Sequence, residues 1–179
     1  ILAFVMAISV FCAAGFTLGR TWNASWIVIY SSITTLFYFW GTGKFNTVST
    51  NWQRPLRILG GLGVFIMMFL LTFRFPWERV SGKYYYGVNE ICSWQAVPDH
   101  ILTFLLLVTA ILLFFDYVKR KDWMKSLFGA LPLLSLVGYV IGGSSVAWAV
   151  LLFNVYMLIV SIFRIISGIR TNSLGFINS

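Results

Sequence analysis

The sequence predicts an all-α, polytopic transmembrane helical bundle with about six membrane-spanning helices in a single domain over residues 1–179. Three observations support this class. Hydrophobic residues make up 59% of the chain and charged residues only 10%, which is more apolar side chain than a soluble domain of this size can bury. The apolar residues form six continuous runs, each about long enough to cross a bilayer. Lysine and arginine lie mainly in alternate connections between these runs.

Six expected helices follow from these runs, and a longer connection separates the third helix from the fourth. The helices cover residues 1–18, 22–40, 56–75, 101–118, 126–142 and 144–166, and the longer connection, the outer loop, covers residues 76–100. A helix of about 20 residues covers about 30 Å of hydrocarbon. Because each run is continuously apolar, whereas barrel strands alternate in units of about ten residues, we expect helices.

The first three helices have recognisable boundaries. The first is apolar from Ile1 onwards, with no basic segment before it and no convincing cleavage site, so we expect a membrane helix rather than a signal peptide. We expect the chain to be a fragment of a longer protein. Trp22 and Trp40 bound the second helix, as aromatic residues do at membrane interfaces. The third helix begins just after Pro55.

The last three helices are separated by proline and glycine. A Pro-Asp-His sequence at 98–100 precedes the fourth helix, Pro132 interrupts the fifth, and Gly142–Gly143 is almost the whole connection to the sixth. So short a turn requires an antiparallel hairpin. Gly138 lies four residues before Gly142, a spacing that lets helix backbones approach closely, although small residues are common in membrane helices in any case.

The basic residues predict an orientation. The connections after the first, third and fifth helices hold Arg20, Arg74, Arg79 and Lys83, whereas the opposite side holds Lys44, Arg54, Arg57, Lys119, Arg120, Lys121, Lys125, Arg164 and Arg170. Positive residues are retained on the cytoplasmic side. We therefore expect both chain ends in the cytoplasm and the outer loop outside, in a bacterial inner (cytoplasmic) membrane.

The net charge of +8 does not indicate nucleic-acid binding, because the basic residues lie beside membrane segments rather than on one soluble face. The expected partner is the lipid bilayer. One turn concentrates cations that can bind anionic lipid at about 1 kcal/mol each: Lys119, Arg120, Lys121 and Lys125. Since Cys12 and Cys92 belong to no Cys/His cluster, we expect no metal and no cofactor.

The outer loop carries the candidate catalytic groups, Glu90, Asp99 and His100. A carboxylate beside a histidine can tune acid–base chemistry. We favour a structural interpretation, in which Asp99 caps the N-terminus of the fourth helix and His100 lies at the interface.

The same loop carries the candidate binding aromatics Trp77, Tyr85 and Trp94. They could stack on a sugar or a lipid headgroup, or contact a protein partner, because exposed Trp and Tyr are favoured at protein interfaces. We favour an interfacial aromatic belt or a small cap on the bilayer.

Within the membrane, Asn154 lies near the middle of the sixth helix. Burying its amide without a partner costs several kcal/mol, so we expect an interhelical hydrogen bond. The alternative is a substrate or ion contact, with Tyr139 as a further polar point. No expected span carries a central charge, which argues against a proton-coupled transporter.

The end of the sixth helix carries a resemblance. Residues 154–178 contain Asn154 in an apolar helix, then Gly168-Ile-Arg170, then Leu174, Gly175 and Asn178. This pattern resembles a segment of an uncharacterised family of bacterial multi-pass predicted membrane proteins, a domain of unknown function. The resemblance implies further spans after Ser179 and no known activity.

Three function classes follow. The favoured class is a non-enzymatic membrane scaffold or partner-binding subunit whose outer loop contacts a protein. The second is a small-molecule transporter or permease with a mid-membrane polar site that includes Asn154 and Tyr139. The third is a membrane enzyme that acts on lipid or glycan at the outer face through Glu90, Asp99 and His100.

Overall fold

The structure is a computed structural model that describes residues 9, 26–42, 50–81 and 97–170. All regular elements within these residues are helices, which confirms the all-α class. The expected helix at 1–18, apart from Ser9, lies outside the described residues, as does the middle of the outer loop at 82–96.

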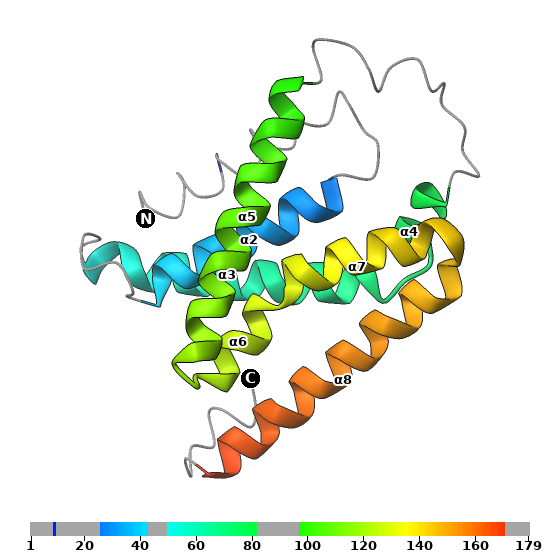
Figure 1. The fold of residues 1–179 in the computed structure, drawn as a ribbon. Coiled ribbons are helices and arrows are strands. Elements are labelled where there is room, and N and C mark those ends of the chain that lie inside the picture. The colour runs from blue at the N-terminus through cyan, green and yellow to red at the C-terminus, as the bar shows by residue number, and fades with distance from the viewer. Residues whose placement is uncertain (1–8, 10–25, 43–49, 82–96, 171–179) are drawn as a thin grey trace.

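Seven helices are described, and they follow the expected order (Figure 1). They are α2 (Trp26–Gly41), α3 (Thr50–Leu71), α4 (Phe75–Val80), α5 (Val97–Lys119), α6 (Trp123–Gly129), α7 (Leu131–Ser144) and α8 (Val146–Arg170). Among them, α5 and α8 are long and apolar enough to cross a membrane. The apolar stretches of α2, α3 and α7 are shorter than a membrane crossing needs.

The described helix α3 differs from the third expected helix at both ends. Helix α3 begins at Thr50 and contains Pro55, and it ends at Leu71 rather than residue 75. Proline removes one helical hydrogen bond, which this helix tolerates near its start. The chain then turns and forms the short helix α4, so the beginning of the outer loop is helical instead of irregular.

The fourth and fifth expected helices also differ from the prediction. Helix α5 begins at Val97, with Pro98 in its first turn, where the missing proline N–H has no helical partner to lose. The expected helix 126–142 is two helices, α6 and α7, separated at Ala130. Pro132 lies in the first two positions of α7, so the proline starts a new helix.

Helix α2 lies at the centre of the described residues and packs very closely on α3. A Cβ atom at Gly41 would overlap the backbone of Arg57, and one at Gly60 would overlap the backbone of Tyr38. Glycine at these positions allows the two backbones to touch.

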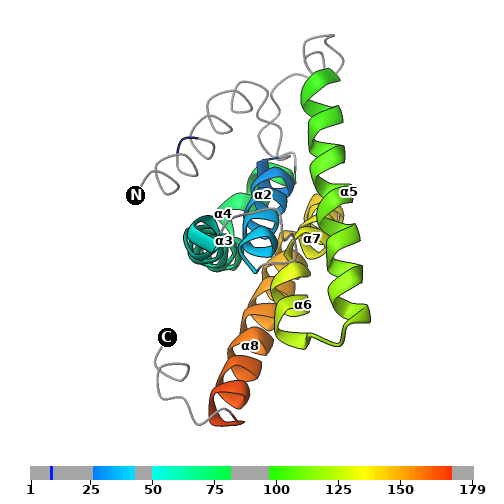
Figure 2. The ribbon, with the colours of Figure 1, turned by 90° about the vertical axis from the view of Figure 1, so that its left-hand side faces the viewer.

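Helices α5 and α8 run in the same general direction, and their C-terminal ends lie at the same end of the molecule (Figures 1 and 2). Helix α3 runs across them rather than alongside, since it is seen almost end-on in Figure 2. The described helices therefore do not form a set of parallel rods.

Candidate functional site

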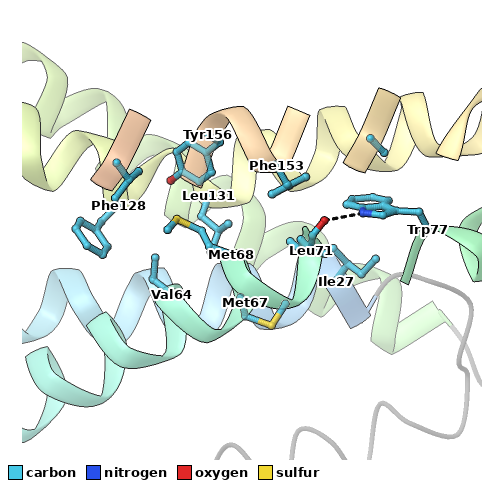
Figure 3. Close-up of a cluster of buried hydrophobic side chains, with 12 residues drawn as sticks. Ile27, Val64, Met67, Met68, Leu71, Trp77, Phe128, Leu131, Phe153 and Tyr156 are labelled. Carbon is cyan, nitrogen blue, oxygen red and sulfur yellow. Dashed lines mark hydrogen bonds between the residues drawn. The ribbon is translucent and has the colours of Figure 1, made fainter. Parts of the chain in front are cut away.

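Trp77 lies inside the protein and not on an outer surface. It is fully buried, its indole Nε1 donates a 2.8 Å hydrogen bond to the Leu71 carbonyl, and its ring stacks on Phe153 with centroids 5.3 Å apart (Figure 3). Helix α4 brings it there, because that helix begins at Phe75, with Pro76 in its first turn, soon after the end of α3. The exposed aromatic ring predicted for the outer loop is therefore absent at position 77.

The Trp77 ring lies against two glycines of α7. A Cβ at Gly138 would be 2.8 Å from Trp77 Cη2, and a Cβ at Gly142 would be 2.9 Å from Trp77 Cε3. The four-residue spacing of these glycines thus accommodates an indole ring from α4. Any larger residue at either position would displace the ring.

Asn154 uses its amide donors within the protein. Its Nδ2 donates to the Val150 carbonyl at 2.8 Å and to the Thr72 carbonyl at 3.2 Å. The second bond joins α8 to the turn after α3, in agreement with the interhelical interpretation. Both amide hydrogens are committed, so only Oδ1 could still accept a bond from a ligand.

Trp77 and Asn154 cap the same helix end. The last carbonyls of a helix have no helical donor, and those of Leu71 and Thr72 receive side-chain N–H groups from α4 and α8. These two candidate binding residues therefore bond to the carbonyls of two successive residues, and they hold the turn between α3 and α4 in place. Tyr139 of α7 is 38% exposed, and no hydrogen bond joins it to Asn154 in the described part of the chain.

The remaining outer-loop candidates are not brought together by the described structure. Tyr85, Glu90 and Trp94 lie outside the described residues. Asp99 and His100 belong to the first turn of α5 by their backbone, and their side chains are not described. Because α5 begins at Val97, Asp99 lies in its first turn, and its capping role stays a prediction. The aromatic platform and the acid–base group remain predictions.

The basic turn between α5 and α6 is half neutralised by acids. Arg120 Nε lies 3.1 Å from Asp116 Oδ2, and Lys125 Nζ lies 2.6 Å from Asp122 Oδ2. Lys119 and Lys121 are exposed, and no ion pair of either occurs among the described residues. Trp123, which follows them, is 67% exposed. Two of the four predicted lipid-binding cations therefore remain available for an anion.

A group of buried hydroxyls on α2 was missed in the sequence. Its members are fully buried: Ser31, Ser32, Thr34 and Thr35. Ser31 Oγ lies 2.7 Å from Ser135 Oγ of α7, which joins the two helices. Four hydroxyl residues within five positions of an apolar run are the signal that could have found this group, since such residues bind across helices.

The break between α6 and α7 is held by α8. The Tyr156 hydroxyl donates a 2.5 Å hydrogen bond to the Leu127 carbonyl, close to the end of α6. Nearby, the Arg164 guanidinium lies 5.8 Å from the centroid of the Phe128 ring. Helix α8 thus caps the C-terminal ends of both α3 and α6.

Within the described residues, no three His, Cys, Asp or Glu side chains come together as a metal site would require. Comparisons of the chain with protein-family models, with curated sequences and with solved structures find no match. The resemblance of residues 154–178 to a family of predicted membrane proteins therefore remains a prediction.

Proposed function

We propose that this chain is a multi-pass integral membrane protein that acts as a non-enzymatic scaffold or partner-binding subunit. The exposure of α5 and α8 is the observation that carries the membrane assignment. In the most apolar 18-residue stretch of each helix, only 11% of α5 and 22% of α8 is buried inside the protein. A soluble protein buries its most apolar helices, so lipid is the solvent that suits these two.

The directions of α5 and α8 support a further crossing between them. Both helices run the same way (Figure 1). A chain that crosses a membrane twice in the same direction must cross back in between. The segment that joins them contains α6 and α7, two helices of 7 and 14 residues that are separated at Ala130. Its break at Ala130 makes each half too short alone. We propose in addition the other membrane crossings that the sequence predicts, which make six in total.

The orientation of the proposal places loop 76–100 outside and both chain ends in the cytoplasm. The C-terminal ends of α5 and α8 lie at the same end of the molecule, so the basic turn that follows α5 and the last turns of α8, which include Arg164, lie toward that end. A common basic end favours the cytoplasmic side of a bacterial inner membrane. It is also where we place the bilayer contact: Lys119 and Lys121, with Trp123 at the interface, would bind anionic headgroups at about 2 kcal/mol in total.

A lipid-vesicle measurement tests this contact. The Lys119→Gln/Lys121→Gln protein should lose a preference for phosphatidylglycerol over phosphatidylcholine that the unchanged protein shows at low salt. The matched control is Arg120→Gln/Lys125→Gln, which removes cations that already have acidic partners and should have the smaller effect. If the control loses more, the two lysines are not the contact.

The scaffold assignment is favoured because the polar groups that were candidates for binding serve the fold. Asn154 donates both amide hydrogens to carbonyls, and Trp77 is buried with its N–H bonded. The transporter remains the second candidate, on one observation: a discontinuous helix, α6–α7, lies beside the buried hydroxyls of α2, and broken helices form substrate sites in many transporters. The partner of the scaffold would bind the outer loop.

Site-directed thiol labelling tests the membrane proposal. In a Cys12→Ser/Cys92→Ser background, Tyr85→Cys should react with an impermeant maleimide in intact cells. Lys121→Cys should react only after the membrane is opened. Ser145→Cys, in the turn between α7 and α8, should behave like Tyr85→Cys if α6–α7 crosses back. Equal labelling of positions 85 and 121 in intact cells would contradict the orientation.

Co-purification tests the scaffold class. Protein extracted from native membranes in mild detergent should retain a partner that is lost when Tyr85 and Trp94 are both alanine. Replacement of Asn154 by leucine should leave that partner bound. Substrate uptake into vesicles that depends on Asn154, without any retained partner, would favour the transporter instead.

A further inference from the structure

Thr35 carries a buried hydroxyl without a hydrogen-bond partner. The residue is fully buried, and Oγ1 has no partner among the described residues. A threonine in a helix usually donates to the carbonyl four residues earlier, which here belongs to Ser31. The Thr34 hydroxyl already contacts that carbonyl at 3.1 Å. An orphaned buried hydroxyl is rare and requires an explanation, of which an internal water is a common one.

Contacts on either side of Thr35 establish which segment it faces. One turn before it, Ser31 contacts Ser135 of α7, and one turn after it, the Phe39 ring contacts Gly129 at the end of α6. Residues four apart share a helix face. Because the two helices run in opposite senses at these contacts, the partner of Thr35 is the segment midway between residues 129 and 135. Thr35 therefore faces the break between α6 and α7.

This break contains a carbonyl without its helical donor. In a continuous helix the Phe128 carbonyl would accept from the N–H of residue 132, which is a proline and has none. The neighbouring Leu127 carbonyl accepts from the Ala130 N–H at 3.2 Å and from the Tyr156 hydroxyl. The break thus combines a free donor, the Thr35 hydroxyl, with an acceptor that has lost its donor.

We infer that one ordered water molecule occupies the α6–α7 break and bridges the Thr35 hydroxyl and the Phe128 carbonyl. Water accepts from the hydroxyl and donates to the carbonyl, which satisfies both groups at once. A buried water needs two to four polar partners, and the Ser31–Ser135 pair lies one turn away. A cation fits less well, because the side chains that define this site, Ser31, Thr35 and Ser135, carry no charge to balance it.

The water would add to a pattern in which two helix ends, those of α3 and α6, are capped by groups from outside the helix. The end of α3 is capped by Trp77 and Asn154, and the end of α6 by Tyr156 and, in this inference, by the water. The inference does not depend on the membrane assignment, since it concerns only contacts inside the protein.

Replacement of Thr35 by valine tests the inference, because valine keeps the shape and removes the hydroxyl. If a water is bound there, Thr35→Val should lower the melting temperature by about 2–4 °C, and Thr35→Ser should stay near the unchanged protein. If the site is dry, Thr35→Val removes an unsatisfied group and should raise the melting temperature. Thr34→Val is the control for hydroxyl loss, because Thr34 donates to the Tyr30 carbonyl at 2.8 Å.

A double-mutant cycle tests whether the Phe128 carbonyl is the second hydrogen-bond partner of the water. Pro132→Ala supplies the missing N–H to the Phe128 carbonyl, so the water loses its acceptor, and Thr35→Val should cost less in that background than alone. Equal costs in both backgrounds would overturn the bridge. Should Pro132→Ala fail to fold, water-edited NMR of threonine-labelled protein decides: transfer from water to the Thr35 methyl must exceed that to the Thr34 methyl. A melting temperature that rises with sodium but not with N-methylglucamine would assign the site to a cation and overturn the water.

Discussion

Helices α2 and α5 differ in the burial of their side chains: α2 buries polar ones, and α5 exposes apolar ones. Helix α2 buries nearly all of its residues, including the hydroxyls of Ser31 and Thr34, whereas α5 leaves Phe104 and Leu112 about two-thirds exposed, at 66% and 65%. Water as solvent would favour the reverse distribution. Neighbouring helices therefore hold α2 by hydrogen bonds and close backbones, whereas α5 exposes the apolar side chains that the proposed bilayer would cover.

The largest effect is expected from removal of the Trp77 ring, which packs against Phe153 of α8 and the glycines of α7. Trp77→Ala should lower the free energy of unfolding by about 3–5 kcal/mol, because the ring is fully buried and the glycines opposite have no side chain to fill the space. Unfolding in detergent micelles measures it. Trp123→Ala, at a position that is 67% exposed, should change stability by less than about 0.5 kcal/mol. Equal losses would place Trp77 outside the core.

An intermediate effect is expected where α2 touches α3. Gly60→Ala should lower the free energy of unfolding by about 1–3 kcal/mol, because its Cβ would overlap the Tyr38 backbone. Gly143→Ala is the matched control, since nothing lies within 4 Å of its Cβ position, and alanine in a helix is favourable. The same unfolding assay should give opposite signs. A neutral Gly60→Ala would mean that α2 and α3 are further apart.

The smallest effect is expected on the exposed face of α5. Leu112→Ala should change the free energy of unfolding by no more than about 0.5 kcal/mol, because the side chain is 65% exposed and has little packing to lose. Ala110→Leu on the same helix should lower it by about 1–3 kcal/mol, since Ala110 is fully buried. A large loss at Leu112 would reveal a protein contact on this face and narrow the difference between the two helices.

The sequence predicted helix positions better than helix interruptions. Continuous apolar runs located α2, α5 and α8, because a helix that is apolar on all sides leaves a long uninterrupted pattern. The apolar pattern does not show where a turn interrupts such a run. Pro55 lies within a helix and Pro132 begins one, and local sequence does not separate these cases, since tertiary contacts such as Tyr156 to Leu127 decide which break is stable.

For the candidate site, the sequence anticipated the need of Asn154 for a partner but not the identity of that partner. The desolvation argument applies to any buried amide, whereas the carbonyl of Thr72 is available only because α3 ends where it does. Trp77 was assigned to the outer loop because it follows a proline beyond the apolar run. Its return to the interior depends on the glycines of α7, more than 60 residues later.

The packing site of Trp77 also has a consequence for folding during synthesis. Trp77 leaves the ribosome well before its packing partners Gly138, Gly142 and Phe153. Its ring therefore has no packing partner on these helices until they have been synthesised. The indole N–H can bond to the Leu71 carbonyl at once, but the ring can pack only after the hairpin of α7 and α8 has been made. Completion of that hairpin is thus the event that locks the earlier half of the chain, and a nascent chain halted before it should remain open to chaperones and proteases.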